Sequence, residues 1–212
     1  MVAAGLLLTG CASEEPTTAA GTSAPGASTV ETPTATATPT PAPMLTVGLD
    51  GIEYTDGAAA KSLAFDDPES LLTVIEELIG EPRHGEDFED PWGNGDVWGT
   101  TYRWTELTVS VMKDGPASIA VLAPTVGGVP VRTLGGVAVG DTRETVVAAG
   151  GWDSWDEDGD GEADYLGIDE REAQGTQSLS RPGAAGREYI VVVLDGDVVS
   201  QLQSPGNDFA DI

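Results

Sequence analysis

The stretch that decides the fold is Leu107 to Pro124, LTVSVMKDGPASIAVLAP, together with its counterpart Tyr189 to Pro205, YIVVVLDGDVVSQLQSP. In both stretches alternating apolar positions flank an Asp-Gly pair that stands ten residues ahead of the proline. These pairs are Asp114-Gly115 and Asp195-Gly196. Asp-Gly between two alternating runs is a strong β-hairpin signal because glycine tolerates a positive φ. The sequence therefore predicts two matched hairpins.

A third strand is expected ahead of each hairpin, over residues 100–104 in one half and 176–180 in the other. A helix is expected ahead of each third strand. Asp67-Pro68-Glu69 supplies a helix N-cap, a proline in the first turn and an acidic residue, and Gly80 and Pro82 end the periodic run. The apolar residues of this first helix fall on one face: Leu71, Leu72, Ile75, Leu78 and Ile79.

The second helix is shorter. Asp141 to Glu144 resembles a capping box, and Gly150-Gly151 provides the end of the helix. Val146 and Val147 are expected to face inward.

Each half therefore consists of a helix, an acidic loop and a three-stranded meander. The expected fold class is α+β, with tandem α-βββ halves (45–125 and 126–212) forming one antiparallel sheet with the helices on one face. This element order, with Gly140-Asp141-Thr142 opening the second helix, is similar to the repeat of the β-lactamase inhibitor protein and of small outer-membrane assembly lipoproteins. The resemblance carries over no inhibitory or assembly residue. The alternative is an unrelated α+β domain with two ordinary hairpins.

Charge limits the partners of the chain. Its 212 residues contain 9 Lys and Arg against 36 Asp and Glu, a formal net charge of -27. Such an excess of acid repels phosphate backbones and anionic headgroups, which excludes nucleic acid as a partner and electrostatic adsorption to a membrane. The single Cys excludes an internal disulfide framework and a thiolate zinc cluster. We expect a monomer.

The first 11 residues, MVAAGLLLTGC, are too short to span a bilayer, which takes about 20 residues. Leu8-Thr9-Gly10-Cys11 resembles the lipobox of bacterial lipoproteins. This resemblance implies that residues 1–10 are a signal peptide and that Cys11 becomes the acylated N-terminus at the extracellular face of the cell membrane. No Lys or Arg precedes Lys61, so the basic region of a signal is missing. Either the true start lies upstream, or the chain is not exported and Cys11 is a plain thiol.

Residues 11–44 form the expected stalk. From Ala12 to Pro43 the chain is almost entirely Thr, Ala, Pro, Ser and Gly, which cannot build a core. Repeated Thr-Pro and Ala-Pro steps favour extended conformations, so the stalk would lift the domain away from the membrane. Its Thr residues could carry O-linked sugars.

A calcium loop is indicated after the second helix. The carboxylates occupy positions 1, 3, 5 and 9 of such a loop, and Gly161 occupies position 6. They are Asp156, Asp158, Asp160 and Asp164. Position 12 is Gly167, so Asp169 or Glu170 would have to replace the usual Glu and the site would be weak. The alternative is a solvated acidic turn.

Tryptophans suggest a binding surface. The acidic loops that follow the two helices, residues 84–97 and 152–164, carry Trp92 in the first and Trp152 and Trp155 in the second. Amphipathic rings beside carboxylates suit an envelope or extracellular protein or a glycan. The alternative, that each Trp caps its own half of the core, applies most readily to Trp98 and Trp104.

Catalytic motifs are scarce. The chain has no G-x-S-x-G elbow, no Cys outside the lipobox and no phosphate loop, and its single His84 stands in a polar segment. The preferred function is a lipid-anchored cell-surface binding protein without catalytic activity. The alternative is a cell-envelope hydrolase using a pair of carboxylates.

Overall fold

The computed structural model describes residues 41–89 and 95–209. The first half contains β1 (Met44–Val47), β2 (Gly51–Asp56), β3 (Ala59–Ala64), α1 (Pro68–Ile79), β4 (Gly85–Glu89), β5 (Val97–Arg103), β6 (Leu107–Met112) and β7 (Ala117–Val121). The second half contains β8 (Thr125–Val126), β9 (Val129–Thr133), α2 (Arg143–Ala148), β10 (Trp152–Trp155), β11 (Tyr165–Ala173), β12 (Gly186–Asp195) and β13 (Val198–Asn207). The signal segment, Cys11, the stalk up to residue 40 and Trp92 lie outside the described residues.

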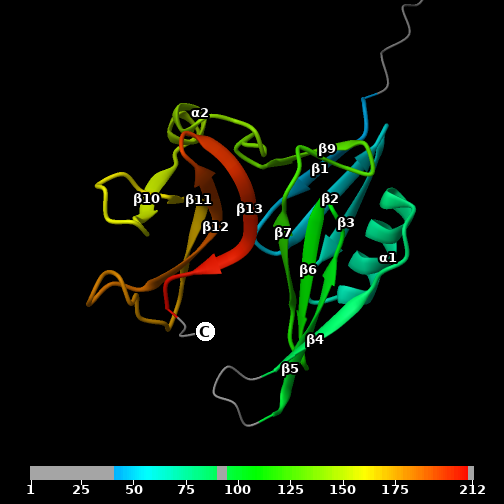
Figure 1. The fold of residues 1–212 in the computed structure, drawn as a ribbon, viewed down its shortest axis with the longest axis horizontal. Helices are drawn as coiled ribbons and strands as arrows, with labels where there is room; N and C mark the ends of the chain where they lie inside the picture. Colours follow the sequence, from blue (N-terminus) through cyan, green and yellow to red (C-terminus); the bar gives the residue numbers. More distant parts are fainter. Residues whose placement is uncertain (1–40, 90–94, 210–212) are drawn as a thin grey trace, which may run out of the picture. The chain divides into compact units, whose positions relative to one another are not determined.

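The strands of the described residues form two sheets (Figure 1). The larger has eight strands in the order β10-β11-β12-β13-β7-β6-β5-β4, and the smaller has five in the order β3-β2-β1-β9-β8. All the pairings are antiparallel except the parallel pairing of β1 with β9. The α+β fold class with antiparallel sheets is thereby confirmed.

Both Asp-Gly pairs close the hairpins that the sequence predicts. Asp114 takes a φ of 57° between β6 and β7, and Gly196 takes a φ of 59° between β12 and β13. The meanders then meet through their last strands, because Leu202 of β13 lies opposite Val121 of β7. The two halves therefore share one continuous sheet.

The meanders differ from the expectation in two ways. Each has four strands, because residues 85–89 form the edge strand β4 rather than part of a loop, and residues 152–155 form β10. Residues 176–180 are not a strand. Leu179, their one large apolar residue, is 59% exposed, whereas Leu166 and Ile168 of β11 are buried and give that strand a face to pack.

The five-stranded sheet is the largest addition to the expected fold. It combines three strands from the start of the domain with two from the start of the second half. Its parallel contact places Leu45 opposite Val131, and this long-range pairing leaves no local pattern in the sequence.

The first helix begins at its predicted cap, Asp67, and the second begins at Thr142, one residue after the start of the predicted capping box at Asp141. Asp67 accepts a hydrogen bond from the Ser70 N–H at 3.3 Å, and Gly80 ends α1 at a φ of 76°. Thr142 accepts from the Thr145 N–H at 3.3 Å at the start of α2. No helix within residues 41–89 and 95–209 is long and apolar enough to cross a bilayer.

Only one of the two valines of α2 faces inward. Val146 is buried, but Val147 is 54% exposed, so the expectation for Val147 was wrong. A helix of six residues presents a narrow buried stripe, and adjacent positions point about 100° apart.

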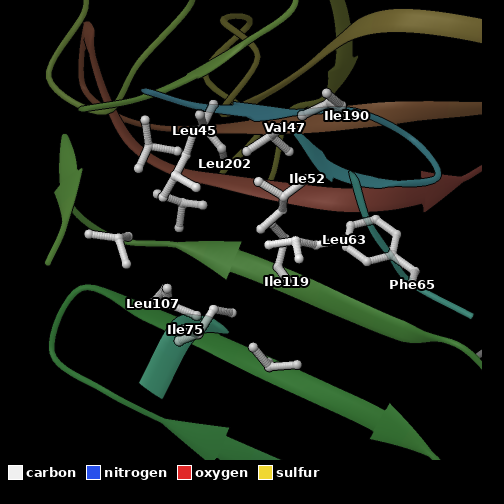
Figure 2. Packing of buried hydrophobic residues seen from close by; sticks show 14 of the residues in the cluster. Leu45, Val47, Ile52, Leu63, Phe65, Ile75, Leu107, Ile119, Ile190 and Leu202 are labelled. Carbon is white, nitrogen blue, oxygen red and sulfur yellow. The ribbon is translucent and has the colours of Figure 1, made fainter. Parts of the chain in front are cut away.

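The core lies between the eight-stranded sheet, the five-stranded sheet and α1, as the side chains of Figure 2 show. Directly paired residues of antiparallel strands share a face. One such row crosses five strands and is buried throughout: Leu107, Val121, Leu202, Val192 and Leu166. Ile75 of α1 and Val146 of α2 belong to the same cluster, so both helices contribute to the covered side.

The neighbouring row lies on the opposite, open face of the same sheet. It consists of Trp152, Gly167, Val191, Gln203, Ala120 and Thr108. Apart from the buried Gly167, these residues are half-buried, and none of them belongs to the buried core cluster. The open face and the loop at its β10 edge are where a functional site can form.

Candidate functional site

The loop between β10 and β11 gathers carboxylates at one edge of the eight-stranded sheet. One oxygen each of Asp156, Asp158 and Asp164 lies within 4.8 Å of the others, so the three groups could hold a metal ion. Asp160 is not part of this cluster, and its carboxylate accepts the Glu162 N–H at 2.9 Å. The fold thus brings together three of the four predicted metal ligands.

Backbone hydrogen bonds hold the loop in shape. The carboxylate of Asp156 accepts from the N–H groups of Gly159 at 2.7 Å and Gly161 at 3.0 Å. Asp158 accepts from Asp160 at 3.0 Å, and Asp164 from Glu157 at 2.7 Å. Gly159 and Gly161 take φ values of 75° and 99°, which side chains rarely adopt. The two glycines therefore allow the turn that draws the carboxylates together.

The twelfth ligand expected for this loop is absent from the described cluster. Gly167 lies within β11 opposite Trp152, and a Cβ there would stand 2.3 Å from the Trp152 ring. Asp169 accepts from the Gly135 N–H at 3.4 Å, and Glu170 pairs with Arg187 at 2.5 Å. Neither Asp169 nor Glu170 belongs to the described cluster of carboxylates. At position 167 the Trp152 ring leaves no room for a side chain.

Trp155 is the exposed aromatic residue of this region. Its side chain is 64% exposed, and it directly precedes Asp156 in the chain. Its cross-strand neighbour Tyr165 donates its hydroxyl to Glu157 at 2.9 Å, and this bond to a carboxylate raises the pKa of Tyr165. An exposed indole, a phenol and the acidic cluster thus share one edge of the sheet.

Trp152 packs against other side chains of the domain. The Arg187 guanidinium carbon stands 3.9 Å from the centre of its ring, and Tyr189 packs against it edge-on at 5.0 Å. Its Nε1 is buried without a hydrogen-bond partner among the described residues. Trp104 is also buried, and donates to the Glu81 carbonyl at 3.4 Å. Of the two predicted contact residues that the structure describes, Trp152 and Trp155, Trp155 is therefore the more exposed.

A buried carboxylate that shares Arg187 as a neighbour with Trp152 was not predicted from the sequence. Asp208, whose side chain is 6% exposed, accepts from the Ser178 hydroxyl at 2.6 Å and the Arg187 N–H at 2.5 Å. Burial pushes the pKa of Asp208 up, but these hydrogen bonds, with help from Ser180 and the charge of Arg181, hold it below the usual value. Asp208 thereby fixes residues 178–181 to the end of β13.

The guanidinium group of Arg171 links the two sheets. Arg171 of β11 donates to Asp50 at 2.8 Å and to Glu188 at 2.6 Å. The hydrogen bond from Arg171 lowers the pKa of Asp50. These partners are up to 121 positions apart in the chain, and no sequence signal pairs them.

Comparisons of the chain with protein-family models, curated proteins and solved structures found no match.

Proposed function

We propose that the chain is a lipid-anchored binding protein of the bacterial envelope, without catalytic activity, which presents Trp155 and the adjoining acidic loop to an extracellular protein or glycan. The observation that carries the proposal is the 64% exposure of Trp155 directly beside the Asp156, Asp158 and Asp164 cluster. Large aromatic rings are enriched at interfaces because they bury much area and keep a polar handle.

The anchor in this proposal is Cys11. The Leu8 to Cys11 motif precedes a Thr, Pro and Ala stalk with only three charged residues, and the domain begins after it. Two or more acyl chains are needed for stable residence in a membrane. The domain therefore contacts the membrane only through the lipid, and its negative charge favours a monomer.

We further propose that the acidic cluster binds calcium. Calcium prefers carboxylate and carbonyl oxygens in flexible loops, which the segment from Asp156 to Asp164 provides. Three clustered carboxylates without a bidentate Glu support affinity in the millimolar range that suits extracellular calcium. Bound calcium would hold the loop, and so Trp155, in one orientation.

A hydrolase is the alternative. It would require a carboxyl group whose pKa is raised so that it can act as an acid, next to one that stays ionised. Hydrogen bonds lower the pKa of Asp50, Asp67 and Asp208, so these three carboxyl groups do not supply the acid.

The binding function is tested by placing a photo-cross-linking residue at position 155 in intact cells. Leu134, which is 80% exposed, provides the matched control position. We expect a discrete cross-linked product from position 155 and none of the same mass from position 134. Identical products at both positions, or none at 155, would count against Trp155 as a contact residue.

A further inference from the structure

The open face of the eight-stranded sheet contains a groove at the junction of the two meanders. It has a volume of about 260 Å³, and its side-chain polar groups come from β6, β7 and β13. They are Thr108, Ser110, Ser118, Gln201, Gln203 and Ser204. The hydroxyl of Ser204 donates to the Gly48 carbonyl at 2.8 Å and is therefore already used within the fold. The groove is separate from the acidic loop and from Trp155, since no residue of β10 or of the loop lines it.

Most of these polar groups have no partner inside the protein. Ser110 shares a hydrogen bond of 3.2 Å with Thr101. The side chains of Thr108, Ser118, Gln201 and Gln203 make no hydrogen bond with any described residue. Two hydroxyls and two amides offer about six donors and a matching set of acceptors to a ligand.

The groove is uncharged although the chain carries a net charge of -27. The outer face of the five-stranded sheet provides the internal comparison: there Thr46 is paired with both Glu53 and Arg132. Arg103, which stands opposite Thr108 on β5, does not line the groove and pairs with Glu86 at 3.7 Å. An anionic ligand would find no base in the groove and a repelling field around it, and a cationic ligand would find no carboxylate.

Peptide ligands also fit poorly. A peptide strand adds to a free sheet edge, but β6, β7 and β13 each have a neighbour on both sides. A helical peptide needs an apolar groove, a proline-rich peptide needs aromatic walls, and a phosphopeptide needs arginines, none of which lines this groove. An apolar ligand would leave the hydroxyls and amides unpaired, which costs free energy.

We propose that this groove binds a neutral oligosaccharide. Sugar hydroxyls both donate and accept hydrogen bonds, as do the Ser, Thr and Gln side chains that line the groove, and they need no charge for recognition. Gln201 and Gln203 stand on the same face of β13 two positions apart, so their amides can bind adjacent hydroxyls. The proposal does not depend on Trp155 or on a metal.

The test is an NMR titration of the isotope-labelled full chain with maltohexaose, cellohexaose, mannohexaose and N-acetylchitohexaose at millimolar concentration. We expect at least one to shift the side-chain amide signals of Gln201 and Gln203 in a saturable manner. Gln203→Ala should weaken that binding roughly five- to tenfold, since it removes at least one hydrogen bond. Ser62→Ala, on the outer face of the other sheet, should not change it.

Anionic hexagalacturonate should not shift these signals. If hexagalacturonate bound as tightly as the best neutral sugar, the inference that the groove rejects anionic ligands would be overturned. Failure of all four neutral sugars, or shifts confined to residues outside the groove, would overturn the proposal, as would an unchanged affinity in Gln203→Ala. If that variant does not fold, Ser118→Ala replaces it with the same criteria. If no sugar shifted the signals of the groove residues but an added folded protein did, the ligand of the groove would be a protein and the glycan proposal would be overturned.

Discussion

Replacing Asp208 by Ala tests whether the end of β13 is held by the buried carboxylate. The substitution removes the acceptor for the Ser178 and Ser180 hydroxyls and the Arg187 N–H. It also removes the negative charge 3.6 Å from Arg181 and 3.8 Å from Arg187. Arg187 keeps its contact with Glu170. The loop over residues 178–181 should consequently loosen.

The expected cost follows from these contacts. A hydrogen bond to a charged group contributes about 1.5–3 kcal/mol, but bonds within one network are not additive. Breaking a buried ion pair costs about 3–5 kcal/mol, and water entering this site near the surface recovers part of it. We therefore expect Asp208→Ala to lower the free energy of unfolding by about 3 kcal/mol and Tm by about 6–12 °C.

The matched control is Asp197→Ala. Asp197 pairs with Arg143 at 3.1 Å, but its side chain is 80% exposed, so its loss should cost less than about 1 kcal/mol. Urea unfolding at neutral pH, followed by circular dichroism, measures both variants. Equal effects of the two substitutions, or a cost below about 1 kcal/mol for Asp208→Ala, would refute the role assigned to the buried carboxylate.

Three further predictions concern calcium, acid and packing. About 10 mM calcium against a Kd of about 1 mM should stabilise the domain by about 1.4 kcal/mol and raise Tm by about 3–5 °C, and Asp158→Ala should abolish that rise in calorimetry. The pKa values of Asp50 and Asp208 are lowered in the folded state. Their contribution to the free energy of unfolding is therefore full above the unfolded pKa of about 3.9, and it is lost as the pH falls through the folded pKa values. Urea unfolding should thus show a loss of stability below about pH 4 that is smaller in Asp208→Ala, and an equal loss in both proteins would contradict this. Gly167→Ala would place its Cβ 2.3 Å from the Trp152 ring, so we expect a cost of about 1–3 kcal/mol and altered tryptophan fluorescence, and unchanged spectra would contradict that contact.

Local patterns in the sequence predicted the elements that local chemistry specifies. The α1 caps at Asp67 and Gly80 and the hairpins at Asp114 and Gly196 are set by residues only a few positions apart. The pairing of β1 with β9 was not predicted, since it depends on which of several apolar strands meet in space. Periodicity along one strand carries no information about its partner.

The candidate site shows the same division. Asp156, Asp158 and Asp164 occupy positions 1, 3 and 9 of a calcium-loop pattern, and this pattern correctly predicted that their carboxylates lie together. The role of Gly167 was not predictable, because it depends on a cross-strand contact with Trp152. The stretch from Thr176 to Ser180 was predicted to be a strand by analogy with the first half, but it lacks the buried apolar face that a strand needs here.

We propose that a lipid at Cys11 holds this domain at the cell surface, and mass spectrometry of the N-terminal peptide from the membrane fraction tests this proposal. The mature chain should begin at Cys11 and carry two or three acyl chains. A soluble chain that retains residues 1–10 and an unmodified Cys11 thiol would contradict it.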